Sequence, residues 1–168
     1  RRAYSLSNAC LEGTPTQITV KRIADGLVSN YLNDTIAAGQ ELSVLGPSGS
    51  FTIEPSAVKR RHLVMIAGGS GITPIMSILE TALRVDPGTR VTLIYGNRSW
   101  GDVIFRERLN RLCEEFGERL TVDHVLERPP QGWTGERGLL AHDVIESRMR
   151  ALELEDDGMQ RYFICGPT

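Results

Sequence analysis

Cysteine, aromatic residues and long apolar runs are all scarce in this sequence of 168 residues. The three cysteines, Cys10, Cys113 and Cys165, are too few and too far apart for a disulfide framework or a zinc cluster. The longest wholly apolar stretch runs from Leu63 to Ala67, which is far too short to cross a bilayer. These absences predict a reduced, cytoplasmic protein with no membrane segment.

Neither sign of charge dominates the sequence. Lys and Arg number 19 and Asp and Glu number 21, so the formal net charge is −2 at pH 7. This balance argues against a nucleic-acid partner, which needs a strongly basic surface. A hydrophobic share of 40% and a charged share of 24% exclude a disordered or collagen-like chain. The histidines, His62, His124 and His142, have no metal-ligand spacing, so no metal site is expected.

The hydrophobic pattern changes near residue 55, and this change predicts two domains. Residues 1–55 are rich in turns, with alternating strand-like runs at 17–21 and 41–45 and a short helix between them at 27–37. A linker is expected at 54–61. In residues 62–168, helices separate the strands, which indicates a parallel sheet with right-handed crossovers. The strands of this part are expected at 63–67, 90–95, 119–126 and 161–165, and its helices at 73–84, 102–116 and from about 139.

A glycine-rich turn directly follows the first of these parallel strands. It reads Gly68-Gly69-Ser70-Gly71-Ile72-Thr73-Pro74 and opens an amphipathic helix. Glycines let the backbone pass close to a pyrophosphate, and the free N–H groups at the start of the helix attract the anion. Pro74 suits the first helical turn, where its missing N–H needs no partner. The turn predicts a dinucleotide site, although a glycine turn of this kind is also often only a tight turn.

Three further motifs each have a structural and a functional interpretation. Arg2-Ala3-Tyr4-Ser5 is either an ordinary edge strand or a strand that presents Arg2 and Tyr4 to a ligand. Gly26-Leu27-Val28-Ser29 is either a capped surface helix or a helix start that binds an anion. Cys165-Gly166-Pro167 ends a parallel strand, where ligands bind in open α/β sheets, although a lone cysteine more often fills the core.

Taken together and in this order, the motifs resemble those of the ferredoxin–NADP reductase family. The resemblance also includes Val20-Lys21-Arg22 and Tyr95-Gly96-Asn97-Arg98, and it extends over the whole chain. Within the family, the sequence is most similar to reductase components of bacterial oxygenases of the ketosteroid or phenylacetyl-CoA type, with flavohaemoprotein reductase modules a close second. The resemblance implies a β + α/β architecture: an antiparallel FAD-binding β-barrel that lacks its amino-terminal part, then a Rossmann-like parallel-sheet NAD(P)-binding domain that lacks its carboxy-terminal part.

The same resemblance implies roles for individual residues. Ser5, near the flavin nitrogen that accepts hydride, and Cys165, beside the nicotinamide, would be the catalytic pair. Arg2 would bind the FAD pyrophosphate, and Tyr4 would lie against the flavin. The complete set of FAD-binding residues would be Arg2, Ala3, Tyr4, Ser5, Val20, Lys21, Gly26, Val28 and Ser29. The nucleotide-binding residues would be Gly69, Ser70, Gly71, Thr73, Pro74, Asn97, Arg98, Arg128, Cys165, Gly166 and Pro167.

The hypothesis that follows is a flavin-dependent oxidoreductase. Electrons would pass from NAD(P)H through FAD to an iron–sulfur centre or ferredoxin that serves an oxygenase, and a [2Fe-2S] cluster could belong to a domain outside this chain. Flavin is needed because nicotinamide gives electrons in pairs and metal centres accept them singly. The alternatives are the reductase module of a flavohaemoprotein that acts as a nitric oxide dioxygenase, and a non-catalytic nucleotide-binding subunit.

The choice between NADPH and NADH rests on the residues after the strand that ends at Tyr95. Arg98 with Ser99 could meet a 2′-phosphate, and Arg128 could assist, whereas an NADH site more often has an acid there. Glu127 argues in the other direction. The sequence favours NADPH by a narrow margin.

Overall fold

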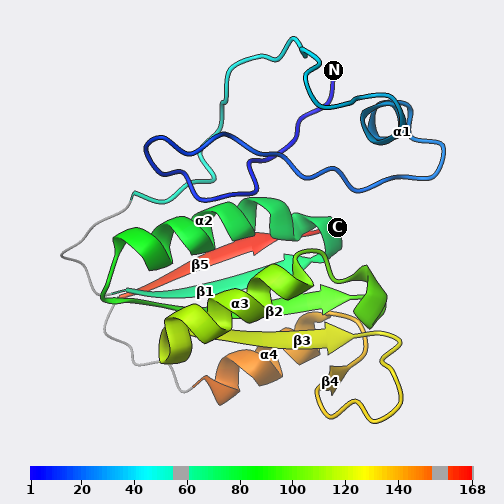
Figure 1. Ribbon diagram of the computed structural model, residues 1–168. Coiled ribbons are helices and arrows are strands. Elements are labelled where there is room, and N and C mark those ends of the chain that lie inside the picture. Colours follow the sequence, from blue (N-terminus) through cyan, green and yellow to red (C-terminus); the bar gives the residue numbers. More distant parts are fainter. Residues whose placement is uncertain (55–60, 153–158, 168) are drawn as a thin grey trace.

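The computed structural model describes residues 1–54, 61–152 and 159–167, and its main feature is a parallel sheet (Figure 1). The five strands that the described residues form lie in the order β4-β3-β2-β1-β5, and every neighbouring pair is parallel. They are β1 (Arg61–Gly68), β2 (Thr89–Asn97), β3 (Leu120–Leu126), β4 (Glu136–Arg137) and β5 (Gln160–Cys165). The central strands β1 and β2 are buried on both faces, which is why they are nearly continuous apolar runs.

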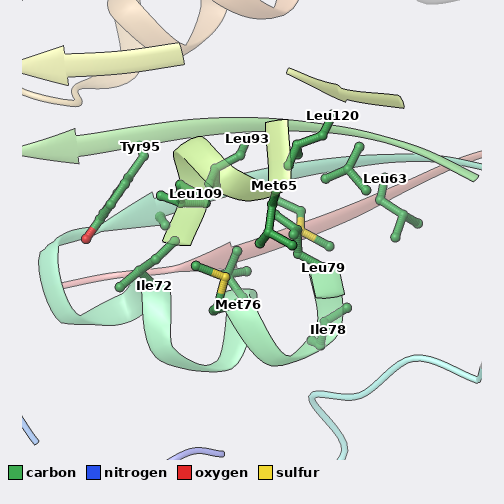
Figure 2. Packing of buried hydrophobic residues seen from close by; sticks show 14 of the residues in the cluster. Leu63, Met65, Ile72, Met76, Ile78, Leu79, Leu93, Tyr95, Leu109 and Leu120 are labelled. Atoms are coloured by element: carbon green, nitrogen blue, oxygen red, sulfur yellow. The ribbon is translucent and has the colours of Figure 1, made fainter. Parts of the chain in front are cut away.

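Helices cover both faces of this sheet. The larger core lies between one face and the helices α2 (Ile72–Val85) and α3 (Arg106–Phe116), and Figure 2 shows its interdigitating side chains. On the other face, Ile66, Ile94 and Val125 pack against α4 (His142–Ala151). The connections that the structure describes contain three short 3-10 helices, η1 (Gly69–Gly71), η2 (Trp100–Asp102) and η3 (Gly117–Arg119).

The sequence predictions for this part are confirmed apart from two details. The four expected strands and three expected helices are present within a few residues of their predicted bounds. The helix expected from residue 102 begins only at Arg106, because Phe105 has a φ of 62°, a left-handed conformation that an α-helix cannot include. The two-residue strand β4 was not predicted, since so short a strand has no detectable alternation.

The amino-terminal part has much less regular structure. The predicted helix forms as α1 (Leu27–Asp34), but the strands predicted at 17–21 and 41–45 do not form in the described residues. A strand needs a neighbour for its backbone hydrogen bonds. Here the pairing consists of an isolated antiparallel bridge between Leu6 and Ile18, with Ser7 N–H donating to the Gln17 carbonyl at 2.9 Å. The antiparallel barrel expected for this half is therefore not formed by the described residues.

Helix α2 lies between the sheet and the amino-terminal segment (Figure 1). Ser7, Asn8 and Ala9 are buried where this segment passes over the helix. The linker predicted at 54–61 lies, apart from its two end residues, outside the described residues. Among the described helices, none combines the length and the apolar character that a membrane crossing requires.

Candidate functional site

The carboxyl ends of β1 and β5 lie side by side at a topological switch point. From β1 the chain crosses through α2 to β2, whereas β5 pairs with the opposite edge of β1, with Ala67 in register with Cys165. Open α/β sheets bind ligands where the connections diverge in this way. The glycine-rich turn and Cys165-Gly166-Pro167, about a hundred residues apart in the sequence, meet at this point.

The two motifs touch backbone to backbone, and only glycine allows this. A Cβ on Gly71 would lie 2.1 Å from the Cys165 carbonyl oxygen, and one on Gly166 would lie 3.1 Å from the Gly68 nitrogen. A Cβ on Gly68 would come 3.1 Å from Cδ of Pro167. The glycines predicted to bind a nucleotide therefore also hold the two strand ends together.

Tyr95 holds the glycine turn from beneath. Its side chain is fully buried, and its hydroxyl donates a hydrogen bond to the Gly69 carbonyl at 3.0 Å, pointing toward the turn before α2 in Figure 2. Gly69 has a φ of 50°, a left-handed conformation that favours glycine. Burial raises the pKa of Tyr95 to about 12, so the phenol stays a neutral donor at physiological pH.

The start of α2 contains the other residues predicted for this turn. The Thr73 hydroxyl donates to the Ser70 carbonyl at 3.1 Å, which leaves the exposed Ser70 side chain at the outer rim of the turn. Pro74 is in the first turn of α2, as predicted.

Asn97 ends β2 with a buried amide that lacks partners. Its side chain is 7% exposed, and within the described part of the chain its amide makes no well-aligned hydrogen bond, although it lies close enough to the Tyr95 hydroxyl to act on the pKa of that phenol. A buried amide without partners is costly, so each such group needs an explanation. A polar ligand at the carboxyl edge of the sheet would supply the missing hydrogen bonds.

A group of charged residues lies beyond the end of β2. Arg98 and Arg128 are both exposed, and the Arg128 N–H donates to the Arg98 carbonyl at 2.8 Å. The Ser99 hydroxyl donates to Asp102 Oδ2 at 2.6 Å, which is the main reason why the pKa of Asp102 lies below its usual range. Lys21 and Arg128 lower this pKa further through their positive charge, so the structure brings these predicted residues near one carboxylate.

The predicted FAD-binding residues occupy a looser part of the structure. Arg2, Ala3 and Ser5 are exposed and Tyr4 is half-buried, and among the described residues no hydrogen bond joins them to the glycine turn. Lys21 does reach the turn, since its Nζ lies 4.0 Å from where a Cβ on Gly69 would be.

The helix start at Gly26 is closed by its own hydroxyl. The buried Ser29 donates to the Gly26 carbonyl at 3.3 Å and accepts from the Ile23 N–H at 3.3 Å. A Cβ on Gly26 would lie 2.4 Å from Ser29 Oγ and 3.0 Å from the Ile23 carbonyl oxygen, so a side chain here would disturb the hydrogen bonds of this turn. Val20 and Val28 are half-buried nearby in the chain. In this structure Ser29 stabilises the turn.

Cys165 combines packing with a position at the sheet edge. Its side chain is half-buried against the larger core. Burial raises the pKa of the thiol, so the sulfur is protonated at neutral pH. A neutral thiol at this edge can contact a ligand ring without adding charge.

Sequence analysis missed the role of Tyr95 and the contribution of Asp102. Tyr95 shares a strand face with Asn97, two residues on, and this alternation was the available signal. His124 is a half-buried residue of β3 whose ring meets Trp100 edge-on at 5.1 Å. The Trp133 ring lies tilted against Trp100, with the ring centroids 5.5 Å apart.

Comparison with known proteins places both halves in oxidoreductase families. Residues 65–168 match the family described as the oxidoreductase NAD-binding domain, and residues 1–53 match the oxidoreductase FAD-binding domain. The chain is 39% identical over 156 residues to NADH-cytochrome b5 reductase 1 of Cryptococcus neoformans, covering 89% of this chain and 51% of that protein. It is 46% identical over 126 residues to the ferredoxin reductase component of 3-ketosteroid-9-alpha-monooxygenase of Rhodococcus rhodochrous, covering 75% of this chain and 35% of that protein.

A solved structure has the same fold. The Amycolatopsis cytochrome P450 reductase GcoB superposes with a TM-score of 0.79 at 27% identity, and the superposition covers 98% of this chain and 47% of that one. The chain thus spans about half the length, or less, of these three proteins.

Gly71→Ala should separate the two strand ends and weaken nucleotide binding. The new Cβ would overlap the Cys165 carbonyl, and relieving this overlap moves backbone, which we expect to cost about 1–3 kcal/mol of folding free energy. Chemical unfolding and titration with NADPH measure the two effects. Gly101→Ala is the matched control, because its Cβ would meet nothing closer than Ser99 Oγ at 3.8 Å. Equal behaviour of the two variants would contradict the close contact described above.

Proposed function

Because the chain belongs to the ferredoxin–NADP reductase family, we propose that it transfers electrons from NAD(P)H through FAD to a metal centre of a partner protein. The observation that carries this proposal is the meeting of the glycine turn with Cys165-Gly166-Pro167 at the switch point of the sheet.

We divide the chain into an FAD-binding domain at 1–55 and an NAD(P)-binding domain at 62–168. The family matches at 1–53 and 65–168 support this division.

The residues at the sheet edge fit a dinucleotide. The turn presents backbone with no side chain at Gly69 and Gly71, which suits a pyrophosphate at the start of α2. The Asn97 amide, buried and without partners in the described residues, offers both a donor and an acceptor to the ligand. We assign nucleotide contacts to these residues together with Ser70, Thr73, Pro74, Arg98, Arg128, Cys165, Gly166 and Pro167.

The amino-terminal residues fit the flavin in chemistry. Arg2 is an exposed guanidinium that can pair with a pyrophosphate, and Tyr4 offers an aromatic face for the ring system. Once bound, FAD would accept an electron pair from nicotinamide and release electrons singly. We assign FAD contacts to Arg2, Ala3, Tyr4, Ser5, Val20, Lys21, Gly26, Val28 and Ser29.

This chain's residues orient the two rings and leave the chemistry to the cofactors. Tyr95 fixes the Gly69 carbonyl, so the turn offers its N–H groups from a constant position. The protonated Cys165 thiol is small enough to lie beside the nicotinamide without displacing it, and the Ser5 hydroxyl would hydrogen-bond near the reacting flavin nitrogen. Such alignment matters because a displacement of about 1 Å can slow a transfer about 100-fold.

For the electron acceptor we favour an iron–sulfur centre or ferredoxin that serves an oxygenase. Support comes from the 46% identity to the ketosteroid monooxygenase reductase component. A cytochrome b5 is the second candidate, because the 39% identity to a cytochrome b5 reductase extends over more of this chain. Both acceptors take one electron at a time.

The first experiment tests whether the purified holoprotein transfers electrons from NADPH or NADH. We expect anaerobic NADPH or NADH to bleach the flavin absorbance and to support ferricyanide reduction. Comparing reduction of a [2Fe-2S] ferredoxin with that of cytochrome b5 then ranks the two acceptors. A protein that binds nucleotide but transfers no electrons would be a non-catalytic nucleotide-binding subunit, and the proposal would be wrong.

Cys165→Ser should slow flavin reduction about 10- to 100-fold at saturating nucleotide, because the more polar hydroxyl changes the surface against which the nicotinamide packs. The rate is measured in stopped flow, with FAD content and melting temperature recorded alongside. Cys113→Ser, a half-buried cysteine of α3, is the matched control and should reduce flavin at the wild-type rate. A rate that falls only in proportion to lost folding would show that Cys165 serves packing alone.

We propose that the nucleotide is NADPH, because Arg98 and Arg128 can pair with its 2′-phosphate. The nearby Asp102 carboxylate acts against this preference. Arg98→Ala should lower the ratio of kcat/KM for NADPH to that for NADH about tenfold, the loss of one charge-assisted contact. Asp102→Asn should raise the ratio, because an acid repels a 2′-phosphate. Arg90→Ala, an exposed arginine near the other end of β2, is the control. An unchanged ratio in Arg98→Ala would contradict the proposal.

A further inference from the structure

A charged pair lies between the two halves of the chain, with Glu80 buried and the Arg108 side chain 26% exposed. Glu80 of α2 is only 5% exposed, although carboxylates are almost never buried without partners. Arg108 of α3 binds it through two nitrogens: Nε donates to Oε1 at 3.3 Å, and a terminal nitrogen donates to Oε2. A terminal nitrogen of Arg84 also lies 3.6 Å from Oε1 of the same carboxylate.

The same two side chains bind the backbone of the amino-terminal segment. The Ala9 N–H donates to Glu80 Oε2 at 3.3 Å, and Arg108 donates to the Ser7 carbonyl at 3.2 Å. One residue further, the Cys10 N–H donates to the Thr81 hydroxyl at 2.9 Å. Side chains of the NAD(P)-binding half therefore hold residues 7–10 by three backbone hydrogen bonds.

This segment is also tied into its own half. The Asn8 side chain accepts from the Gln17 N–H at 2.9 Å and donates to the Pro15 carbonyl at 3.0 Å. The hydroxyls of Ser7 and Thr19 are 2.8 Å apart. When Glu80 and Arg108 fix residues 7–10, these hydrogen bonds also fix the loop that leads to Lys21. The ammonium group of Lys21 lies near the glycine turn.

The location of these contacts links the two cofactor sites. Ser7 comes two residues after Ser5, at the end of the segment assigned to the flavin, and α2 begins directly after the glycine turn assigned to the nucleotide. Apolar residues at these positions would stabilise the contact at least as well as this ion pair, because desolvating the Glu80 carboxylate costs free energy. What the ion pair adds is a specific geometry. A bidentate arginine with a fixed carboxylate sets direction as well as distance.

We propose that Glu80 and Arg108 are positioning residues for hydride transfer, which set the flavin-binding segment against the nucleotide-binding turn. This inference rests on the proposed function of the site. The pair touches neither cofactor and acts through the backbone of residues 7–10. Its loss lets this segment shift and lengthens the hydride path while both cofactors remain bound.

The test replaces the pair in the holoprotein. The double variant Glu80→Gln/Arg108→Met removes both charges together, so no buried charge is left without its partner. Arg108→Met alone is a second variant. Arg84→Met is the matched control, because Arg84 also pairs with Glu80 but otherwise contacts Glu115 and Phe116, and within the described part of the chain it makes no hydrogen bond to residues 7–10.

Two measurements separate positioning from stability. Amide hydrogen exchange of residues 1–10 should be at least tenfold faster in the double variant and in Arg108→Met than in the wild type and Arg84→Met. Flavin reduction by saturating NADPH or NADH should slow about 10- to 100-fold in the same two variants. Reoxidation of dithionite-reduced flavin by ferricyanide should keep its wild-type rate, because it needs no alignment with the nucleotide.

The possible failures are distinguishable. Unchanged exchange of residues 1–10 would overturn the inference, whatever the enzyme does. So would faster exchange with a wild-type rate of flavin reduction, or equal slowing of reduction and reoxidation. If the wild-type holoprotein shows no nucleotide-driven flavin reduction, the proposed function is wrong, and the inference falls with it even if the exchange result is as expected.

Discussion

The close approach of backbone at the ends of β1 and β5 is the constraint on which the rest of the site depends. Gly71 lies against the Cys165 carbonyl at a separation that no side chain would permit, and a Cβ on Gly166 would be tight against the Gly68 nitrogen at 3.1 Å. This contact brings Cys165 to the turn and fixes where α2 begins. A larger residue at either point would move a strand end, and with it every group that the edge presents to a ligand.

Burial controls the chemical state of the groups around this contact. Tyr95 is fully buried and its pKa is raised to about 12, so it remains a hydrogen-bond donor to Gly69 at any physiological pH. Burial also raises the pKa of Cys165, which keeps the thiol neutral. The Asn97 amide is buried as well, with its hydrogen-bonding capacity unused in the described residues. The edge thus combines neutral, fixed groups with an outer rim of charge at Arg98, Asp102 and Arg128.

The two halves of the chain meet through apolar contacts, such as Phe51 edge-on against Phe163, and through a set of polar contacts. Glu80, Thr81 and Arg108 bind backbone atoms of residues 7–10, and hydrogen bonds of this kind have strict geometry. An apolar interface tolerates small displacements, whereas a bidentate ion pair that also binds backbone does not. Under the proposed function, this difference accounts for the buried Glu80 carboxylate between the two halves of the chain.

The sequence by itself determined the alternation of strands and helices after residue 62, the glycine turn and the family. These features are local: apolar periodicity reports which faces are buried, and glycine with proline reports where the backbone must turn. In the amino-terminal part, alternation at 17–21 and 41–45 did predict strands, but a strand forms only when another strand accepts its hydrogen bonds. Which distant residues meet was decided by tertiary structure alone. The contact of Gly71 with Cys165, the bond from Tyr95 to Gly69 and the ion pair of Glu80 with Arg108 each join separate segments, and no local pattern records such a partner.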